Sequence, residues 1–135
     1  MKAIRLKPKA FTIDLQIYPY TIFVCFIDLN LLKECLENYK YKIPNEQIVD
    51  ILSIMKNTRG AAGRALQIDN GNVILFFPTS YFTNSDSYMF NVITHEVLHA
   101  VEMILTRIGL VLDSKTDEAF CYLNGYINEQ IFKEI

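Results

Sequence analysis

The longest helical pattern in the chain, over residues 85–108, constrains the fold more than any other feature. It follows Thr83-x-x-Asp86, which has the spacing of a capping box, and it stops at Gly109, a residue type that commonly ends helices. Its apolar residues fall on most sides of such a helix. They are Val92, Ile93, Val97, Leu98, Val101 and Ile104. The sequence therefore predicts one long helix that packs against a core.

The only two histidines of the chain, His95 and His99, lie in the middle of this segment. On a helix, residues four positions apart lie one turn apart on the same face, so both imidazoles can reach one cation. Because apolar residues surround them in the pattern, we expect a buried pair, which would be costly without a partner. The pattern therefore predicts that His95 and His99 bind one zinc ion.

Glu96 follows His95 directly and completes a His-Glu-x-x-His motif. Helix geometry turns Glu96 about 100° away from His95, so its carboxylate can flank the ion without binding it. A general base that takes a proton from a metal-bound water needs this placement. These residue types rarely occur at these spacings by chance in so short a chain, which makes the motif specific.

A catalytic zinc site uses three protein ligands and one open position, so a third ligand is needed. Glu102 is excluded because it lies seven positions after His95, about 10 Å along a helix axis. Glu118 is the favoured candidate, since it lies at the start of the next predicted helix, after a loop that lets this helix fold back. Asp117 and Asp113 are weaker alternatives, and Asp117 has a capping role to perform.

The rest of the chain predicts an α+β domain that spans residues 1–135. Four strands are expected, over residues 11–17, 20–27, 64–68 and 73–77. Asp69-Asn70-Gly71-Asn72 separates the last two strands and tolerates positive φ, so these strands form a predicted β-hairpin. Further helices are expected after Asp28, after Pro44, and from the capping-box pattern Ser114-x-x-Asp117 to near the last residue.

Charge and hydropathy exclude two classes of partner. The chain has 13 basic and 15 acidic residues and a net charge of −2, without the concentrated positive face that nucleic acid requires. The longest fully apolar run, residues 22–27, is too short to cross a bilayer. The basic cluster near the start of the chain precedes a strand pattern rather than a signal peptide.

Cysteine usage indicates a reducing compartment. Cys25, Cys35 and Cys121 are odd in number and widely spaced, and each lies within an apolar pattern. We therefore expect reduced, buried thiols and a cytoplasmic protein. Cys121 near the zinc site is the less favoured alternative to a small core residue.

The His95-Glu96-x-x-His99 motif, followed by Glu118 on a separate helix, resembles the gluzincin branch of the zinc metallopeptidases. The short length resembles the minimal members in bacterial and phage genomes, including the repressor-cleaving type. The similarity covers residue 64 to the last residue, whereas the first sixty residues match no family. It implies a zincin-like domain with a mixed or antiparallel sheet, in which His95, His99 and Glu118 hold one zinc ion, Glu96 is the base, and a peptide or protein is the substrate.

Two departures from the gluzincin pattern concern Tyr122 and the oxyanion donor. Larger gluzincins often carry an acidic residue four positions after the third ligand, where this chain has Tyr122. They also stabilise the oxyanion with a downstream histidine or tyrosine, and Tyr122 or Tyr126 are the candidates here. Packing of either ring between helices is the simpler interpretation of both residues.

Two further alternatives remain open. Residues 73–77 either present backbone groups to an extended substrate or are fully paired inside the sheet. The domain is either an active peptidase or a catalytically inactive zinc-binding domain with a regulatory or protein-interaction role. Glu96 favours the peptidase, because a structural zinc site closes with four protein ligands and has no use for a flanking base.

Overall fold

Four strands form a mixed sheet in the order β1-β2-β4-β3. The structure, a computed structural model, describes residues 7–57, 62–81 and 86–135. The strands are β1 (Lys9–Asp14), β2 (Thr21–Phe26), β3 (Arg64–Gln67) and β4 (Val73–Phe77). β2 and β4 pair in parallel, whereas β1 pairs antiparallel with β2 and β3 antiparallel with β4. The predicted α+β class, the mixed sheet and the hairpin of the third and fourth strands are confirmed.

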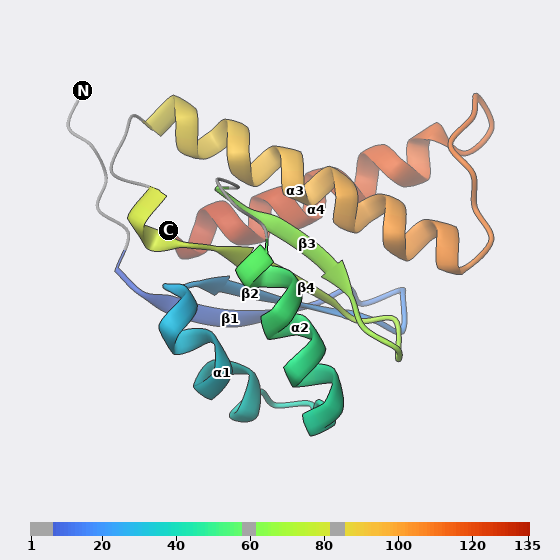
Figure 1. The fold of residues 1–135 in the computed structure, drawn as a ribbon. Coiled ribbons are helices and arrows are strands. Elements are labelled where there is room, and N and C mark those ends of the chain that lie inside the picture. Colours follow the sequence, from blue (N-terminus) through green and yellow to red (C-terminus); the bar gives the residue numbers. More distant parts are fainter. Residues whose placement is uncertain (1–6, 58–61, 82–85) are drawn as a thin grey trace.

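Two pairs of helices enclose the sheet. They are α1 (Leu29–Glu37), α2 (Asn45–Asn57), α3 (Asp86–Arg107) and α4 (Asp117–Glu134), and a short 3₁₀ helix, η1 (Thr79–Tyr81), follows β4. Figure 1 shows α1 and α2 on one face of the sheet and α3 and α4 on the other. The sequence correctly predicts each of the four α-helices, including the long α3 and the C-terminal α4.

The two central strands are buried on both faces. In β4, Val73, Leu75 and Phe77 belong to the core beneath α3 and α4. Ile74 and Phe76 belong to the core beneath α1 and α2. β2 divides in the same way, with Val24 on the α3 side and Phe23 on the other. This explains why both strands lack the polar alternation of a half-exposed strand.

The C-terminal end of α3 forms the glycine-based stop that the sequence predicts. Gly109 has a φ of 90°, and its N–H donates to the Thr106 carbonyl at 2.9 Å. The N–H of Leu110 donates to the Leu105 carbonyl at 2.9 Å. These two bonds are those of a Schellman motif, which satisfies carbonyls that the last helical turn leaves unpaired.

The largest differences from the predicted element boundaries are at the end of the first strand and at the start of the last helix. The first strand ends at Asp14, not at residue 17, because Gln16 adopts a φ of 58° and the chain turns back through a bond from the Leu15 N–H to the Tyr20 carbonyl. The helix α4 begins at Asp117 with Thr116 as its N-cap residue, so the predicted capping box from residue 114 is wrong. The proposed capping box before α3 falls on residues 83–86, partly outside the described residues.

The cysteine prediction is confirmed for one residue and wrong for another. Cys25 is fully buried in β2, and burial raises the pKa of its thiol, as does its contact with Cys35. The hydrogen bond from the Cys25 thiol lowers the pKa of the half-buried Cys35. Cys121 is exposed on α4 rather than part of the core, because the core face of α4 passes through Phe120 and Leu123 instead.

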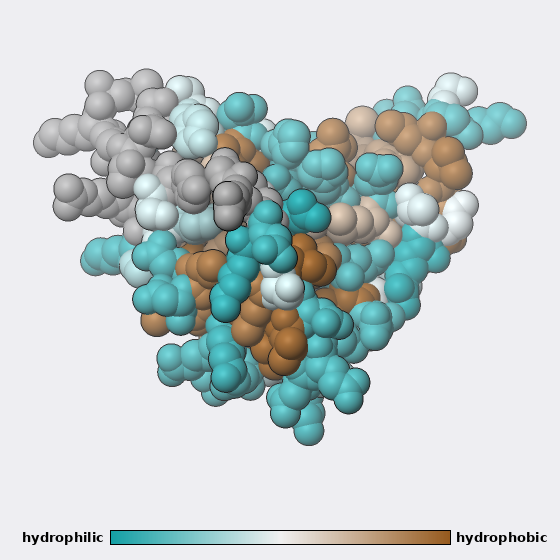
Figure 2. Space-filling model, viewed as in Figure 1, coloured by the Kyte–Doolittle hydropathy of each residue, from teal (hydrophilic) through white to brown (hydrophobic). Residues whose placement is uncertain are grey.

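The connection between α3 and α4 exposes apolar side chains. Val111 and Leu112 are 72% and 60% exposed, and Figure 2 shows hydrophobic surface at the side where Figure 1 places this connection. Across residues 7–57, 62–81 and 86–135, no helix combines the length and apolar character needed to cross a membrane.

Gly71 and Gly109 provide a matched test of the β3–β4 turn. Both have positive φ, 94° and 90°, so alanine at either position should cost about 1–2 kcal/mol in backbone strain. A Cβ on Gly71 would also lie 2.4 Å from the Tyr20 ring and 2.7 Å from Arg107, whereas one on Gly109 meets nothing within 4 Å. We expect Gly71→Ala to lose about 1–3 kcal/mol more than Gly109→Ala in urea unfolding. Equal losses would contradict this packing.

Candidate metal centre

The imidazoles of His95 and His99 converge on one point outside α3. Their Nε2 atoms lie 3.2 Å apart, and the ring centroids are 4.9 Å apart at an interplanar angle of 72°. Two nitrogens that bind one tetrahedral zinc ion at about 2.0–2.1 Å are separated by roughly 3.3 Å. The pair therefore has the spacing of two ligands of a single ion.

Both histidines are exposed, contrary to the prediction of a buried pair. The buried stripe of α3 runs through Ile93, Val97 and Val101, each with 0% exposure, and positions 95 and 99 lie on the opposite side of the helix. The apolar surroundings suggested by the sequence are incomplete, because Leu98 is 56% exposed. The imidazoles are therefore accessible to an ion and to a substrate.

Glu96 lies between the solvent face and the buried stripe of α3. It is 9% exposed and is one of two buried polar residues in the core of the described chain. A Cβ built on Gly63 would lie 2.9 Å from the Cγ of Glu96 and 3.0 Å from the Phe77 ring. The chain just before β3 therefore approaches Glu96 so closely that only glycine fits without a shift. The sequence has a glycine at this position, just before the third predicted strand, but a lone glycine does not indicate a contact with Glu96.

The predicted third ligand is not brought to the histidines. Glu118 is exposed in the first turn of α4, and its N–H donates to the Asp117 carboxylate at 2.9 Å. Asp113 accepts from the N–H of Lys115 at 2.7 Å and so organises the turn before α4. Within the described ranges, no three His, Cys, Asp or Glu side chains form a group that could hold a metal ion. The role of Glu118 stays a prediction.

The two candidate oxyanion donors lie on the side of α4 that meets the β1–β2 turn. Tyr122 is 76% exposed and lines an apolar cavity of about 250 Å³ together with Ile17 and Leu123. The hydroxyl of Tyr126 donates to the Asp14 carbonyl at 3.1 Å. Tyr126 thus joins α4 to β1, and the role of Tyr122 in catalysis stays a prediction.

The strand at the edge of the sheet on this side is β3, not β4. β4 pairs with β2 on one side and with β3 on the other, so of the two alternatives left open for residues 73–77, full pairing inside the sheet is confirmed. β3 contacts α3, and Gln67 fixes this contact by donating to the Met103 carbonyl at 3.2 Å. The open edge beside the histidine helix therefore belongs to β3.

Comparison of the chain with protein-family models, with curated proteins and with solved structures gave no match. The resemblance to the gluzincins therefore rests on the motif of α3 and on the order of the elements.

Metal analysis of purified protein tests the histidine pair. We expect one zinc ion per chain in the wild type. His99→Ala should weaken zinc binding by roughly a hundredfold or more. Loss of a metal ligand lowers the zinc affinity more than loss of a residue that only hydrogen-bonds to a ligand. Asp50→Asn, a change at an exposed position of α2, is the control. Equal zinc content in all three proteins would contradict the assignment.

Proposed function

We propose that the protein is a zinc-dependent peptidase in which His95 and His99 bind the ion and Glu96 is the general base. The observation that carries the proposal is the 3.2 Å separation of the two Nε2 atoms. Glu96, which directly follows His95 on the same helix, is buried. A structural site has no use for such a glutamate, whereas hydrolysis requires a base beside the ion.

In the proposed hydrolysis of a peptide bond, the zinc ion and Glu96 would have separate roles. Bound zinc would polarise the scissile carbonyl and lower the pKa of a water ligand towards about 7. Glu96 would accept the proton of the attacking water and deliver it to the leaving amine, so that the amine departs neutral. The close approach of Gly63 to the Glu96 side chain supports this role, because it restricts the positions that the carboxylate can take.

An extended peptide along the open edge of β3 is the substrate geometry that we propose. The N–H of Ile68 donates to the Asn72 carbonyl at 2.9 Å, so backbone groups of alternate residues, Leu66 and Arg64, point towards β4. The backbone groups of Ala65 and Gln67 then point outward. A peptide that adds as a strand would bond to these groups beside the histidine helix.

We keep Glu118 as the proposed third ligand by resemblance to the gluzincins alone, and its binding would require α4 to bring it closer to the histidines than it lies in the structure. Its side chain is exposed and it lies in the first turn of α4, one short connection after α3. The same resemblance implies a zincin-like fold for the domain, and the confirmed mixed sheet with a hairpin, a long helix and a C-terminal helix is compatible with it.

A second candidate is a non-catalytic zinc domain that acts through a protein partner. The exposure of both histidines favours it, as does the lack of a third ligand near them within the described residues. In this case another chain would complete the coordination sphere, and Glu96 would have no proton to transfer.

Replacing Glu96 by glutamine separates these two candidates. We expect Glu96→Gln to retain zinc but to lower cleavage of a peptide library about 10²–10⁴-fold, because the amide cannot accept the proton. Glu102→Gln, on an exposed position of the same helix, should cleave like the wild type. If the wild type, Glu96→Gln and Glu102→Gln are equally inactive while zinc is bound, the non-catalytic candidate is favoured.

Substitutions in the first turn of α4 test the third ligand. We expect Glu118→Ala to weaken zinc binding roughly tenfold or more and Asp117→Ala to leave it within about twofold, since only the former is a proposed ligand. Isothermal titration calorimetry with zinc measures the affinity of both variants. Loss of zinc affinity with Asp117→Ala alone would overturn the assignment of Glu118.

A further inference from the structure

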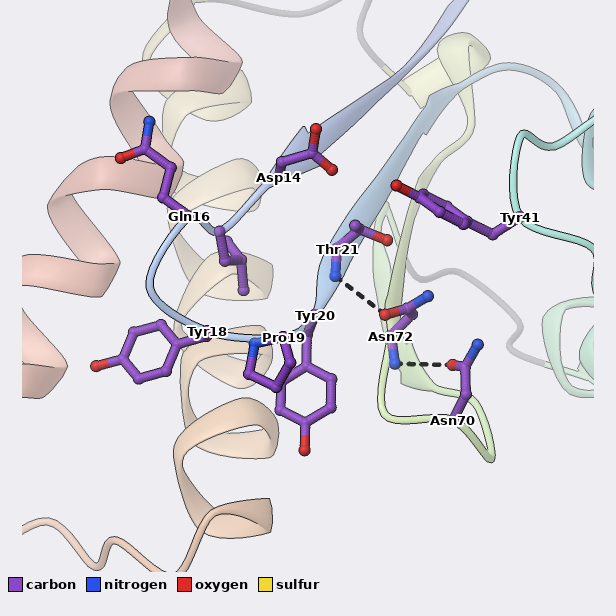
Figure 3. Close-up of a pocket in the computed structure, with 10 residues that line it drawn as sticks. Asp14, Gln16, Tyr18, Pro19, Tyr20, Thr21, Tyr41, Asn70 and Asn72 are labelled. Carbon is purple, nitrogen blue, oxygen red and sulfur yellow. Dashed lines mark hydrogen bonds between the residues drawn. The ribbon is translucent and has the colours of Figure 1, made fainter.

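A polar cavity lies at the end of the sheet where the β1–β2 and β3–β4 turns meet. It has a volume of about 430 Å³, within the range of small-molecule sites. Its walls come from three separate segments of the chain. They are formed by Asp14, Leu15, Gln16, Tyr18, Pro19, Tyr20, Thr21, Tyr41, Asn70 and Asn72, and Figure 3 shows how these residues lie.

Two asparagines hold their amide groups in fixed orientations. The Oδ1 of Asn72 accepts the Thr21 N–H at 3.0 Å, and the Oδ1 of Asn70 accepts the Asn72 N–H at 3.0 Å. Because a backbone N–H can only donate, the oxygen of each amide is assigned and its NH₂ is the free end. Neither NH₂ has a bonding partner within the described residues, so each offers fixed donors.

Asp14 and Tyr41 supply the complementary acceptors. In Figure 3 the Asp14 carboxylate and the Tyr41 hydroxyl lie on the same side of the cavity, above Thr21. No side chain of the described residues bonds to either group, whereas the Thr21 hydroxyl is already bonded to the Tyr39 hydroxyl at 2.8 Å. The cavity therefore offers donors and acceptors together.

The lining excludes two classes of ligand. Its walls contain no Lys, Arg or His, but they include the Asp14 carboxylate, which repels a phosphate or another anion. Arg107, beside the Tyr20 ring, already donates to the Asp69 carbonyl. Three tyrosines line it, but Figure 3 shows Tyr18 and Tyr20 directing their rings away from Tyr41. The rings therefore do not form the cage that binds an organic cation through its π faces.

Neutral polyhydroxylated molecules match the donors and acceptors that line the cavity. A sugar ring has hydroxyl groups that donate to a carboxylate and accept from amide NH₂ groups, and C–H faces that pack on Pro19 and on aromatic rings. The wall also contains Gln16, whose φ of 58° belongs to the tight β1–β2 turn that forms this side of the cavity.

We propose that this cavity is a carbohydrate-binding site, with Asp14, Tyr41, Asn70 and Asn72 as the groups that bond to sugar hydroxyls. The site is independent of the proposed peptidase centre. It lies beyond the C-terminal end of α3, where Arg107 donates to the Asp69 carbonyl at 2.8 Å, two turns of helix past His99.

Saturation-transfer NMR with a panel of neutral disaccharides, namely maltose, cellobiose, lactose and chitobiose, tests the proposal on the full chain. We expect at least one of them to bind the wild type, and to bind equally after zinc is removed with a chelator. Asp14→Asn, Tyr41→Phe and Asn70→Ala should each weaken this binding about tenfold, the usual effect of losing one bond to a charged or fixed group. Asp50→Asn on α2 should bind like the wild type.

Thermal unfolding of each variant separates loss of a contact from loss of the fold. Asn70 and Tyr41 are exposed, so their variants should melt within a few degrees of the wild type. Binding of none of the four disaccharides to the wild type would overturn the proposal. So would disaccharide binding that is as strong in folded Tyr41→Phe and Asn70→Ala as in Asp50→Asn.

Discussion

The parallel pairing of β2 with β4 is the interaction on which the rest of the structure depends. Both strands are apolar on two faces, so each face has to be covered by a helical layer. Parallel neighbours also need a long connection, which is formed here by α1, α2 and the edge strand β3. The two hydrophobic cores, one on each side of the sheet, follow from this pair.

The position of α3 on this sheet determines the character of the candidate metal centre. The helix buries one stripe against β3 and β4, and therefore directs His95 and His99 away from the core. Glu96 lies at the border of the stripe, next to Gly63. The imidazoles are exposed, while Glu96 beside them is buried and its Cγ lies close to Gly63. A site on a packed helix is positioned more precisely than one on a loop.

Much of the fold could be predicted because its signals are local. Helical periodicity identified all four α-helices, and the Asp69–Asn72 turn identified the hairpin. What the sequence pattern predicted wrongly or left open depends on neighbours in space. Cys121 lies in an apolar pattern but outside the buried face of α4. Residues 73–77 have the composition of a strand, but only the pairing on both sides shows that they lie inside the sheet.

The spacing of His95, Glu96 and His99 follows from the order of the residues alone, because helix geometry places residues four apart on one face and turns Glu96 aside. The end of α3 follows in the same way, since Gly109 accepts a positive φ that other residues resist. The solvent-exposed face of α3, the strand at the open edge of the sheet and the surroundings of Glu96 become known only from the folded chain. Those properties depend on packing between segments far apart in the chain, and so do the Asp14, Tyr41 and Asn72 side chains that meet in the polar cavity.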